Sequence, residues 1–137
     1  MFEAVLFDWD GTLADTREVI LASFHEALLE TLHLDVPDEF VERRIGVGAA
    51  GTFREILNSN GVAFDEAVIQ RLVEVKIRVE VERTPEVKLF PGALELLDAL
   101  KGKVKVGLAS MNNREVIDHM LAFLNVSPYF SVVLTKD

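Results

Sequence analysis

Residues 4–13 read Ala4-Val5-Leu6-Phe7-Asp8-Trp9-Asp10-Gly11-Thr12-Leu13. Four apolar residues without a clear period are followed at once by two aspartates. This pattern is typical of a short parallel strand that is buried on both faces and ends in a polar turn. The segment therefore predicts the first strand of an α/β fold, with acidic side chains gathered where that strand ends.

Helical patterns follow this strand. Apolar residues recur at helical spacing from Asp15 to about Leu32, and Asp15 with Glu18 resembles a capping box at the start of the helix. No strand is expected between residues 15 and 90. Further helices are expected over residues 37–44, 50–58 and 65–82.

From residue 91 onward, helices and strands alternate. The expected order is helix 91–100, strand 104–109, helix 114–124 and strand 131–134. Such alternation implies parallel strands joined by right-handed crossovers. We therefore predict an α/β fold in which a Rossmann-like core of about three parallel strands carries an all-helical cap. The core comprises residues 1–14 and 91–137, and the cap comprises the inserted residues 15–90.

Composition excludes several classes of function. The 137 residues include 14 Lys and Arg against 23 Asp and Glu, a net charge of −9, so nucleic acid is not expected as a partner. No apolar stretch suits a membrane span, and the absence of cysteine excludes thiol catalysis and thiolate metal sites. The acidic first ten residues do not resemble a signal peptide, which favours a cytoplasmic location.

Polar side chains follow two of the expected strands. Asp8 and Asp10 come after the first strand, and Ser110, Met111 and Asn112 come after the strand over 104–109. Ligands of open parallel sheets bind outside the carboxyl ends of the strands, so both groups are expected to face one crevice. Residues i and i+2 of a strand point to the same side, which places the two carboxyl groups on the order of 6–7 Å apart.

Two carboxylates at this separation suit phosphoryl chemistry. Their repulsion is tolerable when Mg²⁺ binds Asp8 and Asp10, or when one carboxyl keeps its proton. One carboxylate could then attack phosphorus while the other protonates the leaving oxygen. The phosphate itself would be bound by Gly11, Thr12, Ser110, Met111 and Asn112, partly through backbone N–H groups at a helix start. The same residues also fit an ordinary turn and an ordinary helix cap.

Taken with Phe90-Pro91-Gly92 before a helix, the Asp8-to-Leu13 motif and Ser110 resemble the haloacid dehalogenase superfamily. A helical insertion directly after the first motif is similar to the phosphoglycolate phosphatase and β-phosphoglucomutase-like branch. The resemblance implies that Asp8 is the nucleophile and that Asp10 is the general acid and base, with a backbone carbonyl on Mg²⁺. It also implies that Thr12 and Ser110 position the phosphate. Dehalogenases of the superfamily lack the second aspartate, so Asp10 favours a phosphate-ester hydrolase.

The resemblance also implies residues that these 137 do not supply. In the family, a lysine and an acidic pair that complete the site lie downstream of the third strand. Lys136 and Asp137 are poor substitutes, because exposed terminal residues are usually solvated. We therefore expect the chain to bind Mg²⁺ weakly and to turn over slowly or not at all. We also expect its first strand to lie at a sheet edge, where an apolar strand can associate with another chain.

Two cap segments complete the sequence-based prediction. Arg44 is the candidate to bind a substrate carboxylate or phosphate, although it could simply end a helix before Gly46. The charged residues from Glu74 to Glu82 are interpreted as a solvated helix face.

We predict a Mg²⁺-dependent phosphatase that hydrolyses a small phosphorylated metabolite, such as phosphoglycolate or a sugar phosphate, through an aspartyl-phosphate. The enzymatic alternative is a sugar-phosphate mutase. The alternative from another class is an inactive fragment that acts as an interaction module, forming a homo-oligomer through its exposed sheet edge. A receiver domain phosphorylated on Asp8 fits less well, because it would not contain the helical insertion.

Overall fold

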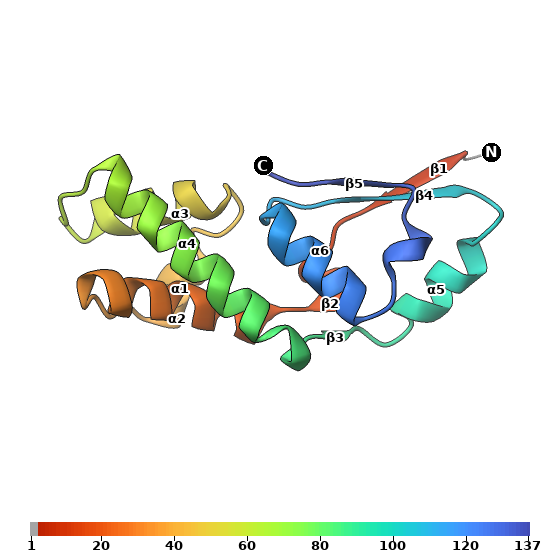
Figure 1. Cartoon of the computed structure of the whole chain (residues 1–137), viewed down its shortest axis with the longest axis horizontal. Coiled ribbons are helices and arrows are strands. Elements are labelled where there is room, and N and C mark those ends of the chain that lie inside the picture. The colour runs from red at the N-terminus through yellow and green to blue at the C-terminus, as the bar shows by residue number, and fades with distance from the viewer. Residues whose placement is uncertain (1–2) are drawn as a thin grey trace.

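The computed structural model of the protein describes residues 3–137. Figure 1 shows a helical part beside an α/β part. The strands are β1 (Ala4–Phe7), β2 (Ala14–Asp15), β3 (Lys88–Leu89), β4 (Lys105–Ala109) and β5 (Val132–Leu134). The α-helices are α1 (Arg17–Leu32), α2 (Asp38–Glu42), α3 (Ala49–Ser59), α4 (Glu66–Glu82), α5 (Ala93–Leu100) and α6 (Arg114–Phe123). Two short 3₁₀ helices are η1 (Thr84–Glu86) and η2 (Ser127–Tyr129).

The core is a parallel three-stranded sheet in the order β1-β4-β5. The predicted α/β class and the parallel pairing are confirmed, and within residues 3–137 the first strand lies at a sheet edge as expected. Leu6 pairs with Gly107, which pairs in turn with Val132, so the three strands are in register across this row. Helices α5 and α6 lie on one side of the sheet. The C-terminal ends of the strands face the helical part (Figure 1).

The prediction that the first strand is buried on both faces is wrong. Side chains alternate along a strand, and Phe7 packs against the apolar core while Leu6 stays 60% exposed on the other face. Val132, across Gly107 from Leu6, is 48% exposed. Within residues 3–137, α5 and α6 lie on only one side of the sheet (Figure 1), and Phe7 packs against the core cluster to which these helices contribute. Four consecutive apolar residues without polar alternation therefore do not show that a strand is buried on both faces.

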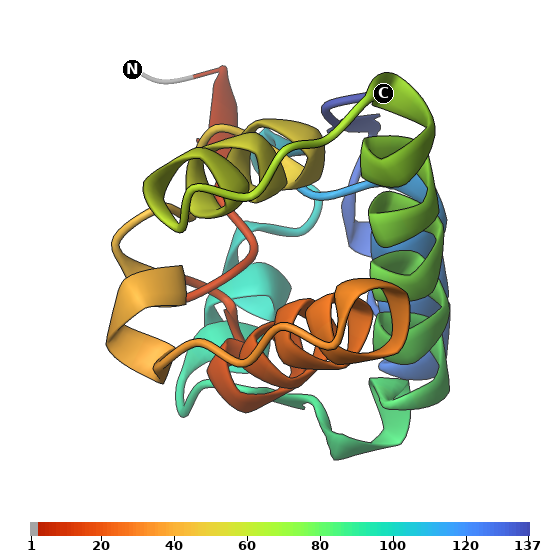
Figure 2. The same ribbon diagram turned by 90° about the vertical axis from the view of Figure 1, so that its left-hand side faces the viewer.

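The helical part surrounds an apolar cluster of its own. Residues from α1, α3 and α4 fill this cluster, with Phe24 and Phe53 in ring contact at 4.8 Å between centroids. Viewed from the cap, α1 lies below, α3 above and α4 to the side, with the sheet behind them (Figure 2). The four expected helices of this part are present with bounds that differ by at most two residues.

Where the chain enters and leaves the cap, it forms a ladder that the sequence did not predict. Strand β2 pairs antiparallel with β3, Ala14 opposite Leu89 and Asp15 opposite Lys88. Two residues on each side are too few to produce a recognisable period. The ladder therefore joins the two segments of chain that connect the core with the cap.

The start of α1 also differs from expectation. The helix is capped at Thr16 rather than Asp15, and no side chain bonds the free N–H groups there. The Thr16 hydroxyl instead donates to Asp10 Oδ1 at 2.7 Å. The capping box is therefore absent, because the hydroxyl at the helix start bonds a carboxyl of the candidate site.

Helix α4 connects the two parts. Val75 and Val79 belong to the cap cluster, whereas Ile77 and Val81 pack against the core cluster. The helix thus has apolar partners on both sides over its second half. In residues 3–137, no helix is long and apolar enough to cross a membrane.

The packing of α5 yields a matched test of the core. Leu97 is fully buried in the core cluster, whereas its neighbour Leu96 is 44% exposed. Leu97→Ala is expected to lower the free energy of unfolding by about 2–5 kcal/mol, because it leaves a cavity in the core. Leu96→Ala is expected to change it by less than about 0.5 kcal/mol. Urea denaturation of both variants measures the difference, and equal effects would contradict the described packing.

Candidate active site

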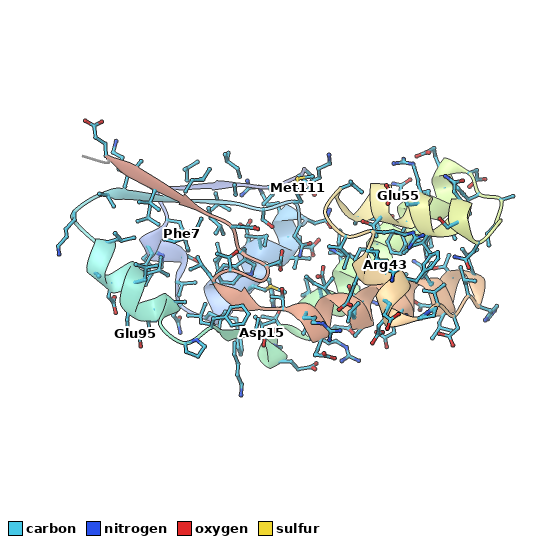
Figure 3. The ribbon with its side chains drawn as sticks, turned by 180° about the vertical axis from the view of Figure 1, so that it is seen from behind. Phe7, Asp15, Arg43, Glu55, Glu95 and Met111 are labelled. Carbon is cyan, nitrogen blue, oxygen red and sulfur yellow. The ribbon has the colours of Figure 1, made fainter. Side chains whose placement is uncertain are left out.

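Asp8 and Asp10 line one cavity with a volume of about 300 Å³ between the sheet and the cap. The loop of residues 110–113, which follows β4, contributes Met111 and Asn112 to the same cavity. Figure 3 shows Met111 at the junction of the two parts. The remaining lining residues come from the cap: Ile20, Phe24, Ile45, Gly46, Gly48, Ala49, Thr52 and Lys76. The structure therefore brings together the two groups that the sequence places after neighbouring strands.

The turn after β1 is organised around one carbonyl. Trp9 O accepts the N–H groups of Thr12, Leu13 and Ala14 at 3.1–3.2 Å, and Gly11 N–H donates to Ala14 O. Gly11 has a φ of 76°, a left-handed conformation that favours glycine. Gly11 and Thr12 do not line the cavity, and their N–H groups are bonded within the turn. Both residues shape the turn, and their contact with phosphate remains a prediction.

Asp10 is bonded on both carboxyl oxygens. Thr16 Oγ1 donates to Oδ1 at 2.7 Å, and Ser110 Oγ donates to Oδ2 at 3.4 Å. Burial raises the pKa of Asp10 above its ordinary value of 3.8, and the negative charge of Asp8 adds to the rise. The Thr16 bond, the Lys76 charge and the Ser110 bond oppose this rise in pKa without cancelling it. A carboxyl whose pKa is raised can keep a proton for donation.

Asp8 lies in a different environment. It is exposed and lines the cavity, and its Oδ1 accepts the N–H of Trp9 at 2.7 Å. Trp9 itself is fully buried in the core cluster on the other side of the chain. Two neighbouring carboxyl groups therefore have distinct surroundings, since Asp8 is exposed and Asp10 is partly buried and hydrogen-bonded on both oxygens, which suits distinct roles.

The 110–113 loop connects the second group to Asp10. Asn112 N–H donates to Ser110 Oγ at 3.0 Å, and the same hydroxyl donates to Asp10 Oδ2. Helix α6 begins directly after Asn113, so its N-terminal end follows this loop. Asn113 is the N-cap residue of α6, but its side chain makes no capping hydrogen bond, and Asp137 Oδ1 accepts the N–H of Arg114 instead.

The interpretation of residues 74–82 as a solvated helix face is wrong at two positions. Lys76 and Glu80 are buried and form an ion pair at 2.6 Å, with Lys76 lining the cavity. Burial raises the pKa of Glu80, and the Lys76 charge opposes that rise. Charged residues four apart resemble a surface pair. The missed signal is the surrounding sequence, because Val75, Ile77, Val79 and Val81 make this part of α4 apolar on two opposite sides.

Arg44 is not among the residues that line this cavity, and its contact with substrate remains a prediction. Its guanidinium stacks on the Phe40 ring at 3.5 Å, and it donates to Phe40 O and to Ser59 Oγ. The alternative interpretation, an arginine at a helix end, describes this geometry. Arg43 likewise lies in the cap, away from Met111 (Figure 3).

The two C-terminal residues lie outside the cavity lining as well. The aliphatic part of Lys136 lies near Gly48, and Asp137 accepts the first N–H of α6.

The donor set suits a hard divalent cation. Asp8 and Asp10 present carboxylate oxygens to one cavity, and Mg²⁺ is typically bound by one or two carboxylates together with waters and a substrate phosphate. In the described part of the chain, no group of three or more His, Cys, Asp or Glu forms a fuller cage. The residues present therefore fit a cation that a bound phosphate also helps to hold.

The chain belongs to the haloacid dehalogenase-like hydrolases, whose family profile matches residues 5–137. Pyrophosphatase PpaX of Bacillus cereus is 30% identical over 139 residues, covering 97% of this chain and 59% of the relative. A predicted phosphoglycolate phosphatase from Haemophilus somnus has a TM-score of 0.86 at 20% identity, covering 99% of this chain and 63% of that one. CbbY from Rhodobacter sphaeroides, in complex with phosphate, has a TM-score of 0.85 at 24% identity, covering 100% and 64%. The two solved structures show a shared fold, and the chain spans about three-fifths of the length of its curated relatives.

The pKa of Asp10 generates a prediction on stability. A raised pKa means that the folded state holds the Asp10 proton more tightly than the unfolded state, so ionised Asp10 destabilises the fold as pH rises. Asp10→Asn keeps an oxygen for Thr16 and removes the charge. In buffer with EDTA, it is expected to raise the melting temperature at pH 8, with a gain that disappears below about pH 4, where the unfolded carboxyl is also protonated. Thermal unfolding across this pH range measures the gain, and a lower melting temperature at pH 8 would contradict the assignment.

Proposed function

We propose that the protein is a Mg²⁺-dependent phosphatase that hydrolyses a small phosphate monoester through an aspartyl-phosphate on Asp8. The observation that carries this proposal is the shared cavity of Asp8, Asp10 and the 110–113 loop at the carboxyl end of the sheet. Membership of a hydrolase family supports it, as do relatives described as a pyrophosphatase and as a predicted phosphoglycolate phosphatase.

The first half-reaction uses both carboxyl groups. The exposed Asp8 carboxylate attacks phosphorus and forms an acyl-phosphate bond, while the ester P–O bond breaks. Asp10 donates its proton to the leaving oxygen, so the alcohol departs neutral. The raised pKa of Asp10 suits this donation, because burial keeps the proton on the carboxyl until the leaving group needs it.

The second half-reaction restores the enzyme. The Asp10 carboxylate accepts a proton from water as the water oxygen attacks the phosphorus of the aspartyl-phosphate. The acyl-phosphate bond breaks, and Asp8 and inorganic phosphate are released. The Asp8 carboxylate and the backbone carbonyl of Asp10 would hold Mg²⁺, which when bound offsets negative charge on the phosphoryl oxygens.

The cavity favours a small leaving group. Its volume of about 300 Å³ is at the lower end of the range for small-molecule sites. The cap side of its wall is largely apolar, with Ile20, Phe24 and Ile45 among its lining residues. Such a wall suits a compact metabolite better than an extended or highly charged one.

Substitution of the two aspartates tests this function. Asp8→Asn is expected to abolish phosphate release from para-nitrophenyl phosphate with Mg²⁺, because an amide cannot form the acyl-phosphate. Asp10→Asn is expected to slow release by about 10²–10⁴-fold, the range for loss of a general acid. Mass spectrometry of quenched wild-type protein should show one added phosphoryl group on Asp8. Release that persists in Asp8→Asn would rule the mechanism out.

A second candidate function is self-association through the sheet, which the exposed row of Leu6, Val132 and Leu134 favours. Within the described residues, β1 pairs only with β4, so its other side leaves unpaired backbone groups that can pair with a second copy of the chain.

Sedimentation equilibrium distinguishes this candidate. The wild type is expected to sediment as a dimer, and Leu6→Lys is expected to be monomeric, because lysines on the paired β1 strands of two copies would replace an apolar contact by like charges. Leu29→Lys, at a residue 46% exposed on α1, serves as the control and should leave the dimer intact. A monomeric wild type would exclude this mode of association. A dimer without phosphatase activity would favour it over the enzymatic function.

A further inference from the structure

The most unusual buried contact outside the two aspartates is the ion pair of Lys76 and Glu80. Both residues lie on α4, four positions apart, and their side chains are 4% and 0% exposed. Removing two charges from water is costly, and the attraction between them compensates only when further hydrogen bonds satisfy the remaining groups. The partners that provide these bonds therefore indicate what the pair does.

Those partners are two asparagines of the 110–113 loop. Lys76 Nζ donates to Asn112 Oδ1 at 2.6 Å and to Asn113 Oδ1 at 3.3 Å. Asn112 Nδ2 donates to Glu80 Oε1 at 3.3 Å. Lysine can only donate and an ionised glutamate can only accept, so the pair selects a single orientation of the Asn112 amide. Two charges from the cap thus fix both ends of one side chain of the core.

Further hydrogen bonds lead from Asn112 to the carboxyl group of Asp10. Asn112 N–H donates to Ser110 Oγ, and Ser110 Oγ donates to Asp10 Oδ2. Asn112 O also accepts the N–H of Lys136 at 3.3 Å. A connected set of polar contacts therefore runs from α4 of the cap through the 110–113 loop to Asp10.

We propose that Lys76 and Glu80 are positioning residues, which hold the Asn112 amide at both ends and so keep the 110–113 loop in the geometry that binds the phosphate of the substrate. The proposal rests on the proposed phosphatase function, since it takes the ligand of the cavity to be a phosphate. The pair acts through Asn112 and is not itself required to touch the phosphate. It also makes the phosphate-binding geometry of the core depend on a helix of the cap.

The test is a thermodynamic cycle on the full chain with inorganic phosphate and Mg²⁺ as the probe. The first variant, Lys76→Met with Glu80→Leu, replaces the ion pair by apolar side chains, an exchange that often leaves stability unchanged or raised. The second variant is Asn112→Ala, and the third combines all three substitutions. Calorimetric titration measures phosphate affinity, and thermal unfolding confirms that each variant is folded.

The pair variant and Asn112→Ala are each expected to bind phosphate about tenfold more weakly, the scale of losing one hydrogen bond to a charged group. The triple variant is expected to lose no more than Asn112→Ala alone, because the pair acts through that side chain. Additive losses, or wild-type affinity in the pair variant, would overturn the proposal. The matched control is Arg71→Met with Glu74→Leu, an exposed pair on the same helix, which should leave the affinity unchanged.

A second readout separates this proposal from the proposed function. The side-chain amide protons of Asn112 should exchange slowly with solvent in the wild type and rapidly in the pair variant, as seen by NMR without phosphate. Glu80→Gln, which keeps the shape and an oxygen facing Asn112, should retain slow exchange. Rapid exchange in Glu80→Gln or in the wild type would overturn the proposal. These two proteins therefore test it even if the pair variant does not fold. A wild type that binds no phosphate would instead contradict the proposed function.

Discussion

The parallel pairing of β1 with β4 is the constraint on which the candidate site depends. It aligns the ends of two strands whose polar residues are 100 positions apart in the chain, so that Ser110 Oγ reaches Asp10 Oδ2. Each strand is followed by a turn with its own set of hydrogen bonds. The Trp9 carbonyl organises the turn after β1, and the contacts of Asn112 organise the loop after β4. Without this register, two short acidic and polar motifs would remain ordinary turn and cap sequences.

The cap completes the cavity and also enters its polar network. Its apolar residues form most of the wall opposite the carboxylates, and α4 packs on both apolar clusters. Thr16, at the start of the cap, bonds Asp10, while Lys76 and Glu80, near its end, bond the 110–113 loop. Both crossings between core and cap thus lie close to residues that set the surroundings of Asp10. A helical insertion placed here can influence phosphoryl chemistry without supplying a nucleophile.

Sequence reasoning succeeded where the signal was local or followed from topology. The long helices carried enough turns to show a period, and the strand-end rule grouped Asp8 and Asp10 with the loop after β4. It failed where a tertiary contact decided the outcome. Leu6 is exposed because, among residues 3–137, helices pack on only the opposite face of the sheet, and the Thr16 side chain does not cap α1 because its hydroxyl donates to Asp10. Lys76 is buried against Asn112, a residue 36 positions away, and its charge pattern alone resembles a surface pair, so only the apolar residues around it could have indicated burial.

The most direct measurement of the central claim is a crystal structure of the protein grown with phosphate and Mg²⁺. The account predicts the anion in the cavity between sheet and cap, next to Asp8 and within hydrogen-bond distance of Ser110 Oγ or of a backbone N–H group of the 110–113 loop. It also predicts Mg²⁺ in contact with the two aspartates. An anion bound instead at the exposed guanidinium groups of the cap, with no density beside Asp8, would contradict it.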